Sequence, residues 1–256
     1  MHVKPAEICK KQTRLPARNR YYCGVNTEEY ARRRAVLQGV TLSVCGSSLA
    51  ALWPGSDGRT AIWLNTANLL LLGVYLLCQK DRALARLLLF GFVFGAVELL
   101  ADALCVRMTK TLDYFPARSA MLFESPWWMP SAWAIVALQT GYLGAWALDR
   151  WGWIKGSALA LLIGTVQIPF YEELAYHAHW WRYQNCRMLG HTPLYIILAE
   201  GLIVAGIAPL ARLVLEKSSN VKAAAILGAL AGLWTTLAGM IGYGIAEFLP
   251  SGFRLP

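Results

Sequence analysis

The sequence predicts an all-α protein, a polytopic membrane helix bundle of about seven transmembrane helices. Of its 256 residues, 57% are hydrophobic and only 15% are charged, whereas a soluble domain carries about a quarter charged residues. The apolar residues also gather in blocks close to the length of about 20 residues that a helix needs to cross the hydrocarbon core. Glycine, alanine, serine and threonine recur within several blocks, which is typical of helices packed in a membrane.

Seven apolar blocks are the predicted spans, and they lie at 36–53, 61–79, 84–106, 128–148, 154–171, 193–215 and 223–248. Short connections at 79–86 and 149–153 predict antiparallel neighbouring helices. Two longer connections, 107–127 and 175–192, fall on the same face of a seven-helix protein, opposite the N-terminus. A loop of about 20 residues in a compact protein is often functional.

A basic tail over 1–34 precedes the membrane domain over 35–256. Nine of the 24 Lys and Arg residues precede residue 35, and the positive-inside rule then predicts a cytoplasmic N-terminus. We expect this tail to contact anionic lipid headgroups and no nucleic acid. The loop Lys and Arg divide eight to seven between the faces, so the tail alone supplies the orientation. The first apolar block starts too late and is too long for a signal peptide. We expect a multi-pass protein of the plasma (inner) membrane with its N-terminus in the cytoplasm.

Neither the cysteines nor the histidines follow a metal-binding pattern. The six cysteines are scattered without a C-x-x-C pair and are predicted to be free thiols. His177 and His179 would face different sides of a helix, and the histidines are too few for the histidine boxes of membrane hydroxylases. A carboxylate-rich di-iron site built from Glu172, Glu200 and His177 lacks the Glu-x-x-His motif. We therefore expect no metal and no cofactor.

Carboxylates within the apolar blocks are the candidate catalytic residues: Glu98, Asp102, Glu173 and Glu200. A charged carboxylate at the centre of a membrane helix costs roughly 2.5–3.5 kcal/mol, so such a residue normally faces a cavity or a partner. At a rise of about 1.5 Å per residue, Glu98 and Glu200 lie roughly 10 Å below the face that carries the long connections. The acids thus converge on one half of the membrane, and the opposite half is predicted to be almost purely apolar.

Glu98 and Asp102 are four residues apart and share one helix face. Two poorly solvated carboxyl groups at that spacing should not both stay ionised. The pair would then offer a proton donor beside a stabilising anion, as acid catalysis requires. The structural alternative is a polar clamp between helices that holds Asn68 or Tyr142.

The segment "QIPFYEELAYHAHWWRY" (167–183) places two acids at the end of a span. Adjacent helical residues point about 100° apart, so only one of Glu172 and Glu173 can face a buried pocket. Aromatic faces stabilise carbocations, although aromatic residues also form ordinary interfacial belts. The predicted substrate-binding residues near these acids are Asn68, Trp133, Tyr142, Trp181, Tyr183 and Tyr195.

Four segments carry a family resemblance: "VELLAD" (97–102), "LDYF" (112–115), "SPWWMPSAW" (125–133) and "EELAYHAHWWRYQNCRMLGHTPLYIILAEGL" (172–202). Over about 90–202 their layout resembles the membrane carotenoid hydratases and the small heterodimer-type lycopene cyclases. In general plan it is also similar to the small membrane terpene cyclases of fungal meroterpenoid pathways. The resemblance implies that Glu98, Glu173 and Glu200 are the acids, with Glu173 favoured over Glu172, and that Trp181 and Tyr183 line the pocket.

The expected function is proton-initiated hydration or cyclisation of a lipid-soluble isoprenoid. Two other classes remain open. A proton-coupled carrier would use the same acids, although no inverted repeat or pair of broken helices is visible. A non-catalytic membrane subunit or assembly factor would use them as contacts between helices.

Overall fold

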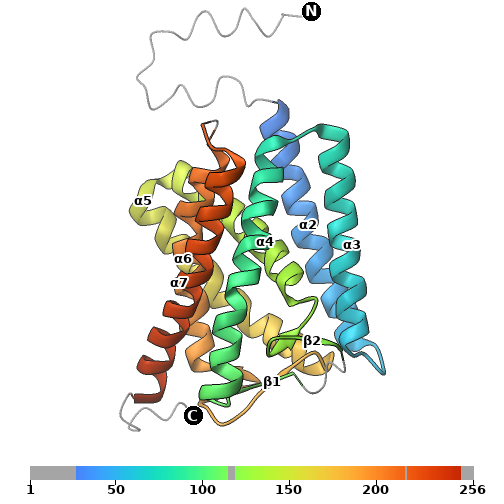
Figure 1. The fold of residues 1–256 in the computed structure, drawn as a ribbon, viewed down its shortest axis with the longest axis vertical. Coiled ribbons are helices and arrows are strands. Elements are labelled where there is room, and N and C mark those ends of the chain that lie inside the picture. The colour runs from blue at the N-terminus through green and yellow to red at the C-terminus, as the bar shows by residue number, and fades with distance from the viewer. Residues whose placement is uncertain (1–26, 115–118, 217, 249–256) are drawn as a thin grey trace, which may run out of the picture.

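The computed structural model describes residues 27–114, 119–216 and 218–248. Within these residues, six helices are long and apolar enough to cross a membrane, which confirms the all-α bundle and an integral membrane protein. Figure 1 shows them as one bundle of upright helices: α2 (Thr27–Leu52), α3 (Gly58–Gln79), α4 (Arg82–Ala103), α5 (Met129–His177), α6 (Leu194–Leu215) and α7 (Val221–Phe248). A π-helical turn, η2 (Leu104–Met108), continues α4.

The helix count differs from the predicted seven because the blocks 128–148 and 154–171 belong to one 49-residue helix, α5. Its backbone leaves helical geometry at Gly152, with φ 79° and ψ 173°, a region that is open almost only to glycine. The residues on either side of the bend then approach each other. A Cβ added to Gly156 would lie 2.6 Å from the Cα of Leu148. Helix α5 therefore folds back at Gly152, and its two arms take the places of the two predicted spans.

Helix α2 begins earlier than its apolar block, so the predicted boundary between tail and membrane domain falls inside it. Its first turn contains Glu28 and Glu29, and acidic residues there interact favourably with the helix dipole. One turn later, Arg32 donates hydrogen bonds of 2.7 and 2.9 Å to Asp81, which also caps the N-terminus of α4. The contact binds α2 to the connection between α3 and α4. Residues 1–26 of the predicted tail lie outside the described residues.

The two long connections lie on the same face of the bundle, as predicted. Strand β1 (Leu112–Asp113) from the first pairs antiparallel with β4 (Arg182–Tyr183) from the second. Two further antiparallel pairs form within the connections: β2 (Met121–Leu122) with β3 (Ser125–Pro126), and β5 (Met188–Leu189) with β6 (Thr192–Pro193). Hydrogen bonds therefore join the two connections into one layer across the ends of the helices.

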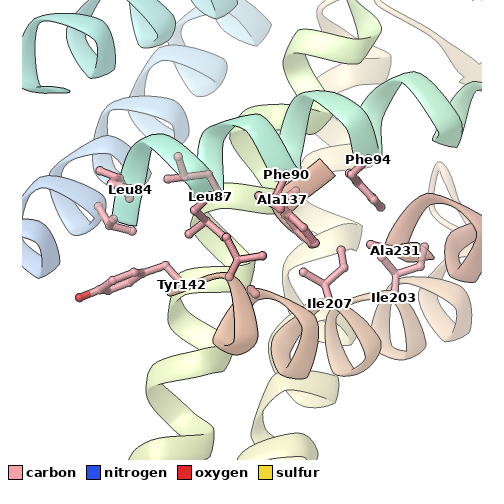
Figure 2. Close-up of a cluster of buried hydrophobic side chains, with 14 of the residues drawn as sticks. Leu84, Leu87, Phe90, Phe94, Ala137, Tyr142, Ile203, Ile207 and Ala231 are labelled. Atoms are coloured by element: carbon pink, nitrogen blue, oxygen red, sulfur yellow. The ribbon is translucent and has the colours of Figure 1, made fainter. Parts of the chain in front are cut away.

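The core lies where α4, α5, α6 and α7 pack together. Figure 2 shows its central side chains, among them Leu84, Leu87, Phe90, Phe94, Ala137, Tyr142, Ile203, Ile207 and Ala231. Small residues let the backbones approach closely. A Cβ on Gly95 of α4 would lie 3.0 Å from the Cα of Pro130, and one on Gly164 would overlap the backbone of Glu200. The second arm of α5 therefore packs directly on the turn of α6 that carries Glu200.

Candidate active site

Glu98 and Asp102 lie one turn apart on α4, and both side chains are buried. The Glu98 residue is only 2% exposed, and its Oε2 has no hydrogen-bond partner among the described residues. A buried polar atom without a partner is costly. Glu98 also lines an internal cavity. The Glu98 side chain therefore forms part of the cavity wall, although Oε2 itself has almost no accessible surface.

Asp102 is held from the connection that follows α4. Its Oδ2 accepts hydrogen bonds from the hydroxyl of Tyr114 at 2.6 Å and from that of Ser125 at 2.7 Å. Burial, together with the nearby carboxylate of Asp102, raises the pKa of Tyr114 well above its usual range. The Tyr114 hydroxyl consequently stays protonated and remains a donor. Asp102 thus has a fixed orientation beside Glu98.

The second connection supplies a donor to a third acid. The indole N–H of Trp181 donates a 2.6 Å hydrogen bond to Oε2 of Glu172 on α5. The Trp181 ring lies 6.2 Å from that of Tyr114, measured between centroids. Burial raises the pKa of Tyr183 well above its usual range, with the Glu172 carboxylate adding to the effect. Residues from both connections therefore build one wall around Glu172 and Asp102.

These acids share one cavity of about 420 Å³. A fourth carboxylate, that of Glu200, lines the same cavity. The lining includes these four acids, several aromatic residues and several apolar side chains: Glu98, Asp102, Glu172, Glu200, Tyr114, Trp133, Trp181, Tyr183, Tyr195, Phe170, Ala199 and Ile203. A cavity of several hundred cubic ångströms that is mostly apolar, with a few convergent polar groups, is typical of a site for a small hydrophobic molecule. No described residue of the cavity wall is Lys or Arg, so the carboxylates there have no cationic neighbour in the lining.

The cavity reaches the side of the bundle. On the second arm of α5, Leu162, Val166 and Phe170 are exposed at successive intervals of four residues, and such a stripe forms one helix face. In a membrane this face contacts lipid. Phe170 also lines the cavity. Phe170 thus belongs both to the outer face of α5 and to the cavity wall, so the wall is thin at this residue.

The structure brings most of the predicted site together, but not Glu173. Glu98, Asp102, Glu200, Trp133, Trp181, Tyr183 and Tyr195 all line the cavity. Glu173 does not, and Glu172 stands in the place predicted for it. Only one of two adjacent helical residues can face the cavity. The rotation of α5 about its axis decides which, and that rotation is set by the close packing of Gly164 on α6.

Asn68 and Tyr142 are also outside the cavity, so the structure does not support their predicted roles. Asn68 accepts a 3.2 Å hydrogen bond from Ser43 between α3 and α2. Tyr142 lies 13 residues after the start of α5, roughly 20 Å from the connection face. There it lines a second, polar cavity of about 680 Å³ with Arg32 and Asp81. The sequence predicted that the opposite half of the bundle is almost purely apolar, and this prediction is wrong. The early start of α2 and the cap of α4 bring Arg32 and Asp81 to that half.

Besides Glu172, two polar residues that bind a site carboxylate were not among the predicted set. Tyr114 and Ser125 belong to the connection between α4 and α5, and both bind Asp102. The motifs "LDYF" and "ESPW" that contain them are visible in the sequence. Nothing in the local pattern says, however, that a loop residue 12 or 23 positions away returns to α4.

Comparison with known proteins identifies a family but no activity. A family model described as a domain of unknown function, DUF6989, matches residues 99–246. The matched segment contains Asp102, Glu172 and Glu200, whereas Glu98 immediately precedes it. No curated protein and no solved structure matches the chain. The resemblance to carotenoid hydratases and lycopene cyclases therefore stays a prediction.

Proposed function

We propose that this chain, which belongs to the DUF6989 family, is a membrane enzyme that hydrates or cyclises a lipid-soluble isoprenoid by proton transfer from a carboxyl group. The observation that carries the proposal is one cavity whose wall holds four carboxylates, among them Glu98 with its buried, unpartnered Oε2. The basic N-terminal segment favours an orientation with the N-terminus on the cytoplasmic side of the plasma (inner) membrane.

The first step is protonation of a carbon–carbon double bond by Glu98. The proton forms a new C–H bond with the electron pair of the double bond, which leaves a tertiary cation and the Glu98 carboxylate. Asp102 is fixed by Tyr114 and Ser125 and supplies negative charge beside the cation. Trp133 and Trp181 also line the cavity. An aromatic face turned to a desolvated cation stabilises it by about 2 kcal/mol.

The cation is then quenched in one of two ways. In cyclisation, a second double bond of the same molecule attacks the cation, and a neighbouring carbon releases a proton, so the product is an isomer of the substrate. In hydration, water attacks the cation and releases a proton, so the product gains the mass of one water. Glu172 and Glu200 line the same cavity and are the bases we assign to the released proton. Its transfer back to Glu98 completes the cycle.

Along α4, an apolar stretch lies between the acids and the polar cavity at the other end, which favours an enzyme over a carrier. Along α4, the buried Phe90 and Phe94 lie between Glu98 and the Asp81 end of the helix. Figure 2 shows Leu87, Phe90 and Phe94 in succession, with Ile203 and Ile207 of α6 alongside. A proton-coupled carrier needs an aqueous or polar route between the two halves. This stretch of α4 does not supply one, although the linings of the two cavities meet on α5 at Tyr142 and Leu143.

Mass spectrometry of isoprenoid lipids tests the proposal. Wild type, Glu98→Gln and Glu29→Gln are expressed at equal membrane levels in cells that accumulate linear polyene isoprenoids, and their lipid extracts are compared. We expect a product of unchanged mass but altered retention, or one heavier by one water, from wild type and Glu29→Gln but not from Glu98→Gln. Glu29 is the control because it is an exposed acid at the opposite end of the bundle. Identical extracts from wild type and Glu98→Gln would refute the proposal.

A further inference from the structure

Three potential metal ligands meet at the end of α5, apart from the cavity lining. They are Glu173 and His177 of α5 and His191 of the β5–β6 turn, and their ligand atoms all lie within 4.8 Å of one another. Oε2 of Glu173 is 2.7 Å from Nδ1 of His191 and 3.8 Å from Nε2 of His177. We propose that this group is a binding site for a divalent transition-metal ion, with Zn²⁺ as the ion of choice.

The sequence builds this group from a helix and a hairpin. Glu173 and His177 are four residues apart on α5 and so share one face. Leu189 pairs with Thr192, which leaves Gly190 and His191 as a two-residue turn. Gly190 has a positive φ of 61°, as the first residue of a type II′ hairpin turn does. Any side chain on Gly190 would overlap Oε1 of Glu173. The glycine therefore allows the turn to bring His191 against Glu173.

Further contacts orient two of the ligands before any ion binds. Oε1 of Glu173 accepts a 2.8 Å hydrogen bond from the backbone N–H of His191, so Oε2 is the oxygen directed at both imidazoles. The ring of Tyr176 stacks on that of His191, with centroids 3.5 Å apart and planes 13° from parallel. Such outer contacts commonly fix the orientation of metal ligands. The alternative role of the Glu173–His191 contact is only to hold the β5–β6 turn against α5. That role does not require the imidazole of His177, which also lies near Oε2 of Glu173.

The spacing and chemistry of the three side chains suit zinc. Zinc binds histidine nitrogen and carboxylate oxygen at about 2.0–2.2 Å, which places neighbouring tetrahedral ligands roughly 3.3–3.5 Å apart. The Glu173–His191 separation of 2.7 Å must widen by roughly 0.7 Å, and the Glu173–His177 separation of 3.8 Å must shorten by roughly 0.4 Å. The three side chains are 39–59% exposed and have room to adjust. Two histidines and one carboxylate leave a fourth position open for water or another ligand.

An ion at this site would link the second connection, through His191, to Glu173 and His177 at the end of α5. That connection carries Trp181 and Tyr183, which form part of the cavity wall. We infer that metal binding stabilises the connection and thereby the wall. The inference concerns binding alone and does not depend on the reaction proposed for the cavity.

Zinc binding to the full-length protein in detergent micelles tests the inference. The protein is stripped with chelator, and bound Zn²⁺ is measured by equilibrium dialysis for wild type, His177→Ala, His191→Ala and His179→Asn. We expect about one zinc per chain for wild type and His179→Asn, and at least tenfold weaker binding for the other two variants. His179 is the matched control because it is exposed and outside the group. Asparagine tolerates the positive φ of 55° at that position.

Thermal unfolding separates a metal site from a purely structural contact. Zinc should raise the melting temperature of wild type but not that of His177→Ala. Because His177 is exposed and lies 3.8 Å from Glu173, its loss should leave the metal-free melting temperature nearly unchanged, which shows that the variant is folded. Absence of zinc binding by wild type, or equal zinc binding by wild type and both alanine variants, would overturn the inference.

Discussion

The hydroxyl of Tyr114 donates a 2.6 Å hydrogen bond to Oδ2 of Asp102, and both side chains are buried. This bond ties the connection after α4 back onto the helix from which it emerges. Tyr114 directly follows β1, whose partner strand β4 includes Tyr183. One hydrogen-bonded layer therefore positions the donor to Asp102 and a wall residue beside Glu172.

Replacing Tyr114 by phenylalanine should lower the free energy of unfolding by about 1–3 kcal/mol, because a buried carboxyl oxygen loses a donor. Denaturant unfolding in micelles measures the change. Tyr30→Phe is the control, since Tyr30 is exposed on α2. A double-mutant cycle with Asp102→Asn isolates the pair. An interaction energy near zero in that cycle would show that Tyr114 and Asp102 are not coupled.

Replacing Gly152 by alanine should destabilise the protein by about 1–3 kcal/mol, because φ 79° and ψ 173° form a conformation that residues with a Cβ rarely adopt. Strain in the backbone is the cause, since a Cβ at Gly152 meets no other atom within 4 Å. Gly73→Ala is the matched control. Gly73 lies within α3 and is likewise free of close neighbours, so its replacement should be neutral or stabilising by up to about 1 kcal/mol. Equal unfolding energies for the two variants would contradict the bend at Gly152.

Cys186 should react slowly with iodoacetamide. Burial, with the nearby Glu247 carboxylate, raises the pKa of its thiol to about 11, and the thiolate is the nucleophile. At pH 8 the reactive fraction is then roughly a hundredfold smaller than for an ordinary cysteine with a pKa of about 8.5. The rate should rise about tenfold per pH unit up to about pH 10, measured by mass spectrometry of the Cys186 peptide.

The unfolded chain is the control for Cys186, because its thiol there has an ordinary pKa. Glu247→Gln should increase the rate in the folded protein, since it removes a negative charge that opposes formation of the thiolate. A rate that levels off near pH 9 in the folded protein would show that Cys186 is neither buried nor close to Glu247.

Spans and acid depth were predictable because both depend on short-range patterns. An apolar block near 20 residues long marks a span, and the helical rise sets how deep Glu98 and Glu200 lie. The rotation of a helix about its own axis was harder to predict from the sequence. For α5 the surrounding sequence is apolar on most sides, so the pattern did not distinguish Glu172 from Glu173. The sequence likewise showed a break near 149–153, but not that the two arms are one helix bent at Gly152.

The sequence by itself determined that this is a helical membrane protein with carboxylates within its spans, because hydropathy and helical spacing are properties of neighbouring residues. Only the tertiary structure decided that Glu98, Asp102, Glu172 and Glu200 share one cavity and that Glu173 joins His177 and His191 instead. The physical reason is that these groupings depend on close contacts between distant segments. Two such contacts are the packing of Gly164 of α5 against α6 and the pairing of β1 with β4. No local pattern encodes the partners in either contact.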